Sequence, residues 1–92
     1  MSDNWVHDQD LQRFRVKLEP GYEAVVLYQL VDGVAYVTST RVPDELQGKG
    51  YGKVMMEAVL PEFERLNWKI VPKCSYVRHY LERHEKWQHL VF

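Results

Sequence analysis

A glycine-rich stretch between a strand-like run and a helix-like run most constrains how this chain can fold. The stretch extends from Val42 to Gly52, reads VPDELQGKGYG, and has a glycine at every second position of its last five. Glycine lets backbone N–H groups approach a ligand closely, and the first turn of a helix offers unpaired N–H donors with a partial positive charge. The stretch therefore predicts a phosphate or pyrophosphate site at a strand-to-helix junction.

The spacing of these glycines differs from that of two common phosphate-binding motifs. A dinucleotide fingerprint reads G-x-G-x-x-G and a P-loop reads G-x-x-x-x-G-K-[ST], and the chain contains neither. The spacing present is Gln47-x-x-Gly50-x-Gly52. Taken alone, this pattern leaves two interpretations open: a ligand-binding loop, or a glycine-rich turn that only begins a helix.

Residue patterns on both sides of the stretch predict strands and helices. Residues 12–18 alternate between apolar and charged side chains, which is typical of a strand with one face in water. The dipeptide Asp32-Gly33 separates two runs rich in Val and Tyr, and it is a signal for a two-residue type I′ hairpin. The expected strands are residues 12–18, 22–31, 34–41 and 69–72, and the expected helices are residues 51–67 and 74–84.

The expected fold class is α+β, with the order β-β-β-α-β-α and a mixed sheet in a single domain over residues 1–92. Three antiparallel strands come first. The fourth returns through a helix, so it should lie parallel to the third by a right-handed crossover. Pro61 falls inside the first predicted helix, where it removes a backbone hydrogen bond, so we expect a kink there. The apolar tail from Trp87 to Phe92 should pack back onto the domain.

Composition and charge exclude several classes of protein. Hydrophobic residues make up 46% and charged residues 27% of the chain, which is ordinary for a globular domain and argues against disorder. The net charge of −1 argues against nucleic acids and membranes as general partners. One cysteine excludes an internal disulfide and a cysteine-cluster metal site. With no visible signal peptide and no apolar run that could span a bilayer, we expect a cytoplasmic protein without a metal.

A second block of sequence follows the predicted helix and reads KIVPKCSYV from Lys69 to Val77. Together with the glycine-rich stretch, it resembles the small stand-alone GNAT-like N-acetyltransferase family (the YjdJ type) from Phe14 to Val91. In the GNAT superfamily the pattern Gln/Arg-x-x-Gly-x-Gly/Ala is the coenzyme A pyrophosphate loop. The resemblance implies a minimal GNAT-like fold in which two parallel strands splay apart and admit the pantetheine arm, with an open acceptor side.

The resemblance also implies acetyl-coenzyme A as cosubstrate and a set of residues that bind it. Backbone groups of Thr40, Arg41 and Val42 would pair with pantetheine, and a strand N–H would polarise the thioester carbonyl. The family often has Glu and His where Thr38 and Ser39 stand, so this chain lacks an obvious acid/base pair there. The expected pyrophosphate cradle consists of Gln47, Gly48, Lys49, Gly50, Tyr51, Gly52 and Lys53.

Two residues are candidates for chemistry at the acetyl end of the coenzyme. Cys74 falls at a predicted helix start beside Lys73, and both features favour the thiolate. The resemblance adds a role as nucleophile or thiol-exchange site, whereas a small buried hydrophobe is the alternative. Tyr80 is spaced from the helix start like the general-acid tyrosine of GNAT enzymes and could protonate the departing thiolate. Its alternative is packing in the core.

The second predicted helix also has a basic end. His79, His84 and His89 are five residues apart, unlike the i, i+4 pairs of zinc-binding helices, so we do not expect them to bind a metal. This basic end of the helix is either a face exposed to solvent or a region that attracts the 3′-phosphate of the coenzyme. Its members are Arg78, His79, Arg83, His84 and Lys86.

The expected function is binding of acetyl-coenzyme A and transfer of its acetyl group to an amine acceptor, which the sequence does not identify. The expected partners are therefore coenzyme A and an unknown amine on a small molecule or a protein. One alternative is an acyl-coenzyme A binding or sensing module with little or no turnover. Another is a scaffold that uses only the fold.

Overall fold

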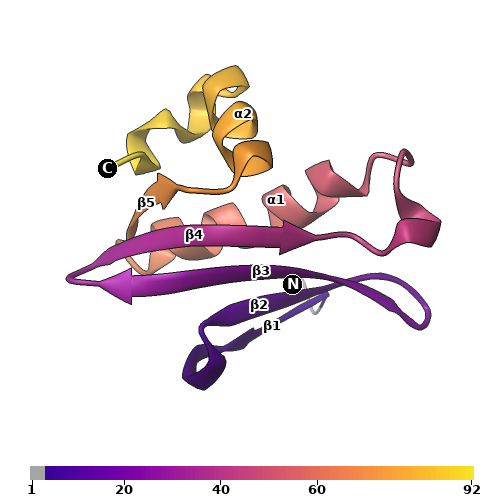
Figure 1. The fold of residues 1–92 in the computed structure, drawn as a ribbon. Helices are drawn as coiled ribbons and strands as arrows, with labels where there is room; N and C mark the ends of the chain where they lie inside the picture. The colour runs from indigo at the N-terminus through magenta and orange to yellow at the C-terminus, as the bar shows by residue number, and fades with distance from the viewer. Residues whose placement is uncertain (1–3) are drawn as a thin grey trace.

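The computed structural model describes residues 4–92 as a mixed sheet with two α-helices (Figure 1). Short 3₁₀ segments at Gln9–Leu11, Asp44–Leu46 and Glu85–Leu90 connect or follow these elements. The strands and α-helices, in chain order, are β1 (Trp5–Asp8), β2 (Arg13–Glu19), β3 (Tyr22–Val31), β4 (Val34–Arg41), α1 (Tyr51–Arg65), β5 (Lys69–Pro72) and α2 (Ser75–Arg83).

The sheet has the strand order β1-β2-β3-β4-β5. Neighbouring strands are antiparallel except β4 and β5, which are parallel and joined through α1. The predicted α+β class, with three antiparallel strands followed by a parallel one, is therefore confirmed. The sequence analysis missed β1, because a four-residue strand with the sequence WVHD is too short to show a clear alternation. The observed order is β-β-β-β-α-β-α.

The hairpin between β3 and β4 has the predicted geometry. Asp32 and Gly33 have φ angles of 51° and 78°, both in the left-handed region that a type I′ turn requires. This turn sets the register from Val31 opposite Val34 to Tyr28 opposite Val37, and the register shifts by one residue beyond that pair.

Helix α1 continues through Pro61 as one element, so the chain does not break into two helices there. Pro61 is exposed, as is Glu57, whose carbonyl loses its hydrogen-bond donor to the proline, so water can satisfy that carbonyl. The helix ends two residues earlier than predicted, at Arg65. Asn67 then takes a φ of 63°, and the N–H of Trp68 donates to the carbonyl of Phe63 at 3.0 Å.

Both helices lie on the same side of the sheet (Figure 1). Alternate residues of β2 and β3, such as Phe14 and Val26, are fully buried, and they share one hydrophobic core with Met55 and Val59 of α1 and Val77 of α2. The alternation predicted for β2 therefore sets which face of the sheet the helices cover. The other face of β2 carries the charged side chains of Arg13, Arg15 and Lys17.

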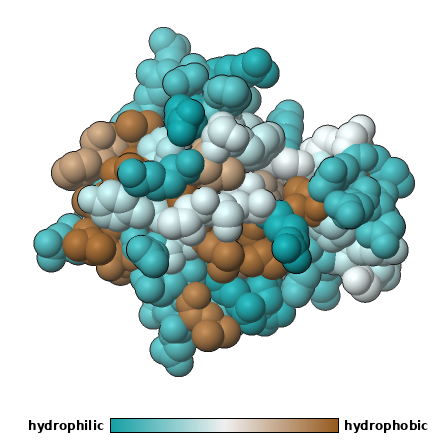
Figure 2. Space-filling model, viewed as in Figure 1, coloured by the Kyte–Doolittle hydropathy of each residue, from teal (hydrophilic) through white to brown (hydrophobic). Residues whose placement is uncertain are grey.

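The C-terminal tail packs back on the domain, as predicted. Trp87 and Leu90 are buried, and the N–H of Phe92 donates to the carbonyl of Ile70 at 2.9 Å. Hydrophobic residues also reach the surface among polar ones (Figure 2), and Phe92 is 74% exposed. In the described part of the chain, neither helix is long and apolar enough to cross a membrane.

Candidate functional site

Strands β4 and β5 pair over only part of their length. The last pair joins Val37 to Pro72. Beyond it, the N–H groups of Lys73 and Cys74 both donate to the carbonyl of Val37, at 2.9 and 3.0 Å, as the chain turns into α2. Strand β4 continues to Arg41, paired with β3 on its other edge. The C-terminal part of β4 is therefore not paired with β5.

A β-bulge lies where this pairing ends. Leu27 faces Ser39 and Tyr28 faces Val37, so Thr38 is an extra residue in β4. The Thr38 hydroxyl donates to the carbonyl of Leu27 at 3.4 Å. A bulge bends its strand and increases the local twist. Here it turns the end of β4 at the point where β5 has stopped.

The segment after β4 is held in place by one buried side chain and by local hydrogen bonds. Leu46 is 2% exposed and anchors the segment in the interior. The Gln47 side-chain amide donates to the carbonyl of Val42 at 3.0 Å and to the carboxylate of Asp44 at 3.2 Å. The Gln47 side chain therefore braces the loop rather than projecting toward a ligand.

The three glycines of the loop serve two different purposes. Gly48 and Gly50 both have a φ of 82°, in the left-handed region, and no atom lies within 4 Å of the position that a Cβ would take. Backbone conformation requires glycine at both sites, and the space above them is open. Gly52 is different, because a Cβ there would lie 2.7 Å from the Cζ of Tyr76 and closer still to its hydroxyl.

These elements border two adjoining hollows, which share Val42 and Gln47. Most of the predicted coenzyme-binding residues line one or both of them, whereas Lys49 is exposed on the loop outside both. The first hollow, of about 380 Å³, is lined by Val42, Leu46, Gln47, Gly48, Gly50, Tyr51, Gly52, Lys53 and Tyr76. The second, of about 440 Å³, is lined by Thr40, Arg41, Val42, Pro43, Asp44 and Gln47.

The first hollow suits an anion. It lies at the N-terminal end of α1, whose first turn has no acidic side chain. Unpaired N–H groups and the helix dipole favour negative charge there. Tyr51 does not contribute its hydroxyl, which donates to the carboxylate of Glu19 on β2, and this bond raises the pKa of Tyr51. Its contribution is therefore limited to the backbone.

Cys74 lies across the gap from β4. Its sulfur is 3.4 Å from the hydroxyl oxygen of Thr40, and it immediately precedes α2. Burial raises the pKa of the Cys74 thiol, but the Thr40 hydroxyl and the backbone N–H groups of Val77, Tyr76 and Thr40 outweigh it and lower the pKa below its ordinary value. The start of α2 and the Thr40 hydroxyl thus favour the thiolate, whereas Lys73, which the sequence analysis named, is not among the groups that lower this pKa.

Tyr80 is buried with an unsatisfied hydroxyl. Among the buried side-chain polar atoms of residues 4–92, its hydroxyl is the one without a hydrogen-bond partner. Its ring stacks on that of His84 with 3.9 Å between centroids. Burial raises the pKa of Tyr80, and the charges of Glu57 and Tyr76 raise it further. The phenol is therefore protonated near neutral pH and has a proton to donate.

A third hollow, of about 330 Å³, lies between α1 and α2 and connects Tyr80 with the loop. It shares Lys53 and Tyr76 with the first hollow. The sequence analysis gave Tyr76 no role, because only the packing of α2 against α1 brings it over Gly52. Burial raises the pKa of Tyr76, and so does the charge of Cys74. The lining residues are Lys53, Tyr76, His79, Tyr80, Arg83 and His84.

Within the described residues, no three His, Cys, Asp or Glu side chains are grouped to hold a metal ion. Two of the histidines that the sequence singled out have other contacts. His84 Nδ1 lies 2.8 Å from the carbonyl oxygen of Tyr80, and His89 Nε2 lies 2.8 Å from the carboxylate of Glu64.

Comparison with known proteins identifies the family of this chain. A search of curated proteins gave no match. Among solved structures, a proposed GCN5-like N-acetyltransferase from Staphylococcus aureus, determined by NMR, is 30% identical with a TM-score of 0.71, over 99% of this chain and 91% of that one. The ribosomal-protein-S18-alanine N-acetyltransferase from Escherichia coli is 20% identical with a TM-score of 0.50, over 71% of this chain and 38% of that one, a similarity of fold alone.

The family assignment covers most of the chain, including the loop, the gap beside β4 and α2. The family described as GCN5-related N-acetyl-transferase matches residues 13–90. This range contains every residue that the sequence proposed for the site. The chain belongs to the GCN5-related N-acetyltransferase family.

Proposed function

We propose that this protein binds acetyl-coenzyme A and transfers the acetyl group to an amine. The observation that carries the proposal is the hollow of about 380 Å³ at the start of α1, beside the part of β4 that β5 leaves unpaired. A helix N-terminus next to left-handed glycines suits a pyrophosphate. A free strand edge suits an amide-containing arm, which can pair with it as another strand would.

The coenzyme would be held mainly by backbone groups. Backbone N–H groups from Gly48 to Gly52 would bind the pyrophosphate, with Lys53 adding charge from the hollow and Lys49 from the exposed loop. The free edge of β4 from Thr40 to Val42 would pair with the pantetheine amides. Because backbone groups impose little on side-chain identity, Gln47 and Tyr51 are free to brace the structure instead.

Bound acetyl-coenzyme A would supply a thioester. In the transfer, the amine nitrogen would form a bond to the acetyl carbon as the carbon–sulfur bond breaks. The amine would lose a proton and the sulfur would gain one. A backbone N–H of β4 near the bulge at Thr38 would stabilise negative charge on the acetyl oxygen. Tyr80, with its unpartnered hydroxyl, would donate the proton to sulfur. Tyr76 is a second phenol for this step, since its pKa responds to the charge of Cys74.

Cys74 would act at the acetyl end of the site as a nucleophile or in thiol exchange. Its position beside Thr40, with a lowered pKa, supports this role. A covalent acetyl-cysteine would form as the coenzyme thiol leaves and would then pass the acetyl group to the amine. Direct attack by the amine is the other route, in which Cys74 only borders the reacting groups.

A binding or sensing module with little turnover is the second candidate function. Thr38 and Ser39 lie where the pairing of β4 with β5 ends, and neither side chain can serve as a general base near neutral pH. These two positions therefore supply no side chain that could take the proton of an attacking amine. This observation favours coenzyme binding over rapid catalysis.

Titration calorimetry with acetyl-coenzyme A tests the proposal first. Free coenzyme A thiol is then followed with a panel of amines: a lysine peptide, a peptide with a free N-terminus, a polyamine and a small primary amine. Binding with amine-dependent thiol release supports the transferase. Binding without release supports the module. The absence of binding contradicts both and leaves a scaffold.

A further inference from the structure

The face of the sheet opposite the two helices is rich in positive charge. Among the described elements no helix covers this open face (Figure 1). By strand register, β1 to β4 place four cations and two carboxylates on it, a net charge of +2, whereas the whole chain has a net charge of −1. The open face therefore attracts an anionic partner. Its charged residues are Asp8, Arg13, Arg15, Lys17, Glu23 and Arg41.

Two of these cations have no carboxylate partner within residues 4–92. Asp8 accepts hydrogen bonds from two arginines of β2, at 2.9 Å each, and one of these arginines also pairs with Glu23 at 3.3 Å. Lys17 and Arg41 are exposed and form no ion pair in the described part of the chain. Asp44 borders a hollow together with Arg41, but its carboxylate accepts a hydrogen bond from a side-chain amide of the loop instead. Lys17 and Arg41 can therefore pair with carboxylates of a bound partner.

Apolar side chains lie between the cations of the open face. Val25 of β3 is opposite Arg15 of β2 and Arg41 of β4, and Val6 of β1 is opposite Arg15. This row alternates apolar and cationic side chains across four neighbouring strands, a distance of about 14 Å at the usual strand spacing. An extended peptide covers that distance with about four residues. The row therefore suits a peptide segment with carboxylate and apolar side chains better than it suits a small molecule.

The row ends at the gap proposed for the acetyl group. Thr40 contacts Cys74 at 3.4 Å, whereas the next residue, Arg41, lies on the open face opposite Val25. Strand β5 has already ended at Pro72, and the chain turns from there into α2. The coenzyme would fill the hollows at the start of α1, so the open face provides the second approach to the reacting groups.

We propose that the acceptor amine lies on a peptide segment with neighbouring carboxylates, which binds along the row from Arg41 to Val6, an inference that rests on the proposed function. The transfer is the one described above: the amine of the segment gains the acetyl carbon and loses a proton, and the coenzyme leaves as its thiol. Pairing of the carboxylates with Arg41 and Lys17 holds the amine at the gap. A second copy of the chain would instead place these cations against the same cations.

The test uses three peptides that each have one free α-amine and share one leucine. They differ in having two Glu, two Gln or two Arg residues close to the amine. Their N-acetylated, C-terminally labelled forms report affinity by fluorescence anisotropy in the presence of coenzyme A, and thiol release from acetyl-coenzyme A reports KM for the free amines. At low salt the parent should favour the Glu peptide over the Gln peptide about fivefold, the effect of two exposed ion pairs, and the Arg peptide should bind most weakly. Added salt should reduce the preference.

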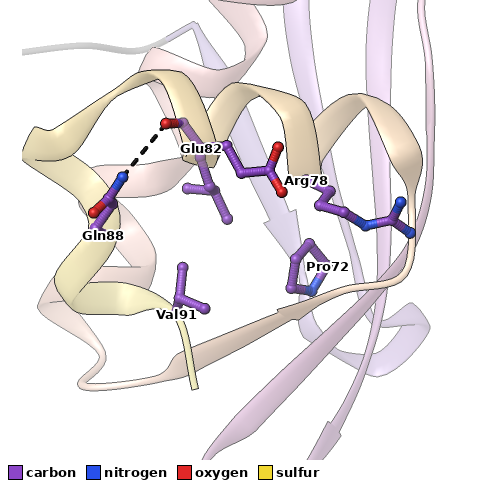
Figure 3. A pocket seen from close by; sticks show the side chains of 6 residues that line it. Pro72, Arg78, Glu82, Gln88 and Val91 are labelled. Carbon is purple, nitrogen blue, oxygen red and sulfur yellow. Dashed lines mark hydrogen bonds between the residues drawn. The ribbon is translucent and has the colours of Figure 1, made fainter.

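Two arginine variants locate the preference. Arg41→Gln should lose most of the preference for the Glu peptide over the Gln peptide, a ratio that compares two ligands on the same variant. Arg78→Gln is the matched control, because it removes the same charge elsewhere. Arg78 lies on α2 and lines a separate hollow of about 280 Å³ with Pro72, Glu82 and Val91 (Figure 3). This variant should keep the parent's preference.

Equal affinity of the parent for the three peptides, with acetyl-coenzyme A still bound, would overturn the inference and leave the proposed function intact. A preference lost equally in Arg41→Gln and Arg78→Gln would reduce it to general charge and would also overturn the inference. Binding to phosphatidylserine vesicles without a preference among the peptides would assign the open face to a membrane instead. If the parent does not bind acetyl-coenzyme A, the proposed function fails, and the inference fails with it. A circular dichroism spectrum of each variant establishes that it is folded.

Discussion

The hydroxyl of Thr40 lies 3.4 Å from the sulfur of Cys74. The C-terminal end of β4 therefore contacts the residue that directly precedes α2. The two residues are 34 positions apart in the chain. Their contact joins the edge of β4 that would hold the coenzyme to the thiol proposed for its acetyl end. It also makes the acidity of the thiol depend on a residue in another element.

Replacing Thr40 by valine should raise the pKa of Cys74, because the hydroxyl that favours the thiolate is lost. Alkylation of Cys74 should then become slower near neutral pH, while the rate at high pH stays the same. The rate is measured against pH with iodoacetamide, and Cys74 is the only cysteine in the chain. Thr38→Val is the control, since the Thr38 hydroxyl bonds to Leu27 instead. Identical profiles for Thr40→Val and the parent would contradict the role of the contact.

The two glycines at the start of α1 should respond differently to alanine. Gly50→Ala should cost about 1–2 kcal/mol of unfolding free energy, because a residue with a Cβ is strained at positive φ. Gly52→Ala should act through its collision with Tyr76, so removing that ring in Gly52→Ala/Tyr76→Ala should restore the lost stability relative to Tyr76→Ala alone. Urea unfolding of the single and double variants measures both effects. Rescue of Gly50→Ala by Tyr76→Ala would show that this distinction is wrong.

Two buried tyrosines form a matched pair for testing the unpartnered phenol. Tyr28→Phe should lower the unfolding free energy by about 1–2 kcal/mol, because the Tyr28 hydroxyl lies 2.6 Å from Nε2 of His7. Tyr80→Phe should be neutral or stabilising, because it removes a buried hydroxyl that has no partner among the described residues.

The same Tyr80→Phe variant tests the proposed acid. If Tyr80 protonates the leaving thiolate, the rate of acetyl transfer should fall while the affinity for coenzyme changes little. Tyr76→Phe is measured beside it. A loss of rate in Tyr76→Phe alone would assign proton transfer to Tyr76 and leave Tyr80 as a packing residue.

Acid should destabilise the protein through His7. Burial lowers the pKa of His7 from its ordinary value of 6.5, although the charges of Glu62 and Asp8 partly offset it. The unfolded chain therefore binds a proton more readily than the folded one, and stability is lost as pH falls below 6.5 toward the folded-state pKa. Chemical unfolding between pH 7 and about pH 5 should show this loss, and His7→Gln should reduce it. An equal loss in His7→Gln would place the effect on another group.

Local sequence patterns were enough to predict the strands and turns that depend on residues close together in the chain. Alternation in β2 identified its buried face, and Asp32-Gly33 identified the hairpin, because both depend on residues close together in sequence. The position of the glycine-rich loop at a strand-to-helix junction followed from its flanking residues for the same reason. Strand β1 was missed because it is short and is defined by its pairing with β2 rather than by its own sequence.

The same distinction between local and distant residues applies to the candidate site. The sequence by itself determined the chemical types available: glycines before a helix, one thiol at a helix start and a basic end of α2, since these depend on residue identity and near neighbours. Only the tertiary structure decided their partners: Cys74 with Thr40, Tyr76 over Gly52, and Arg83 rather than Arg78 near Lys53. The physical reason is that a contact between distant residues depends on how the helices pack on the sheet, and no local pattern contains that information.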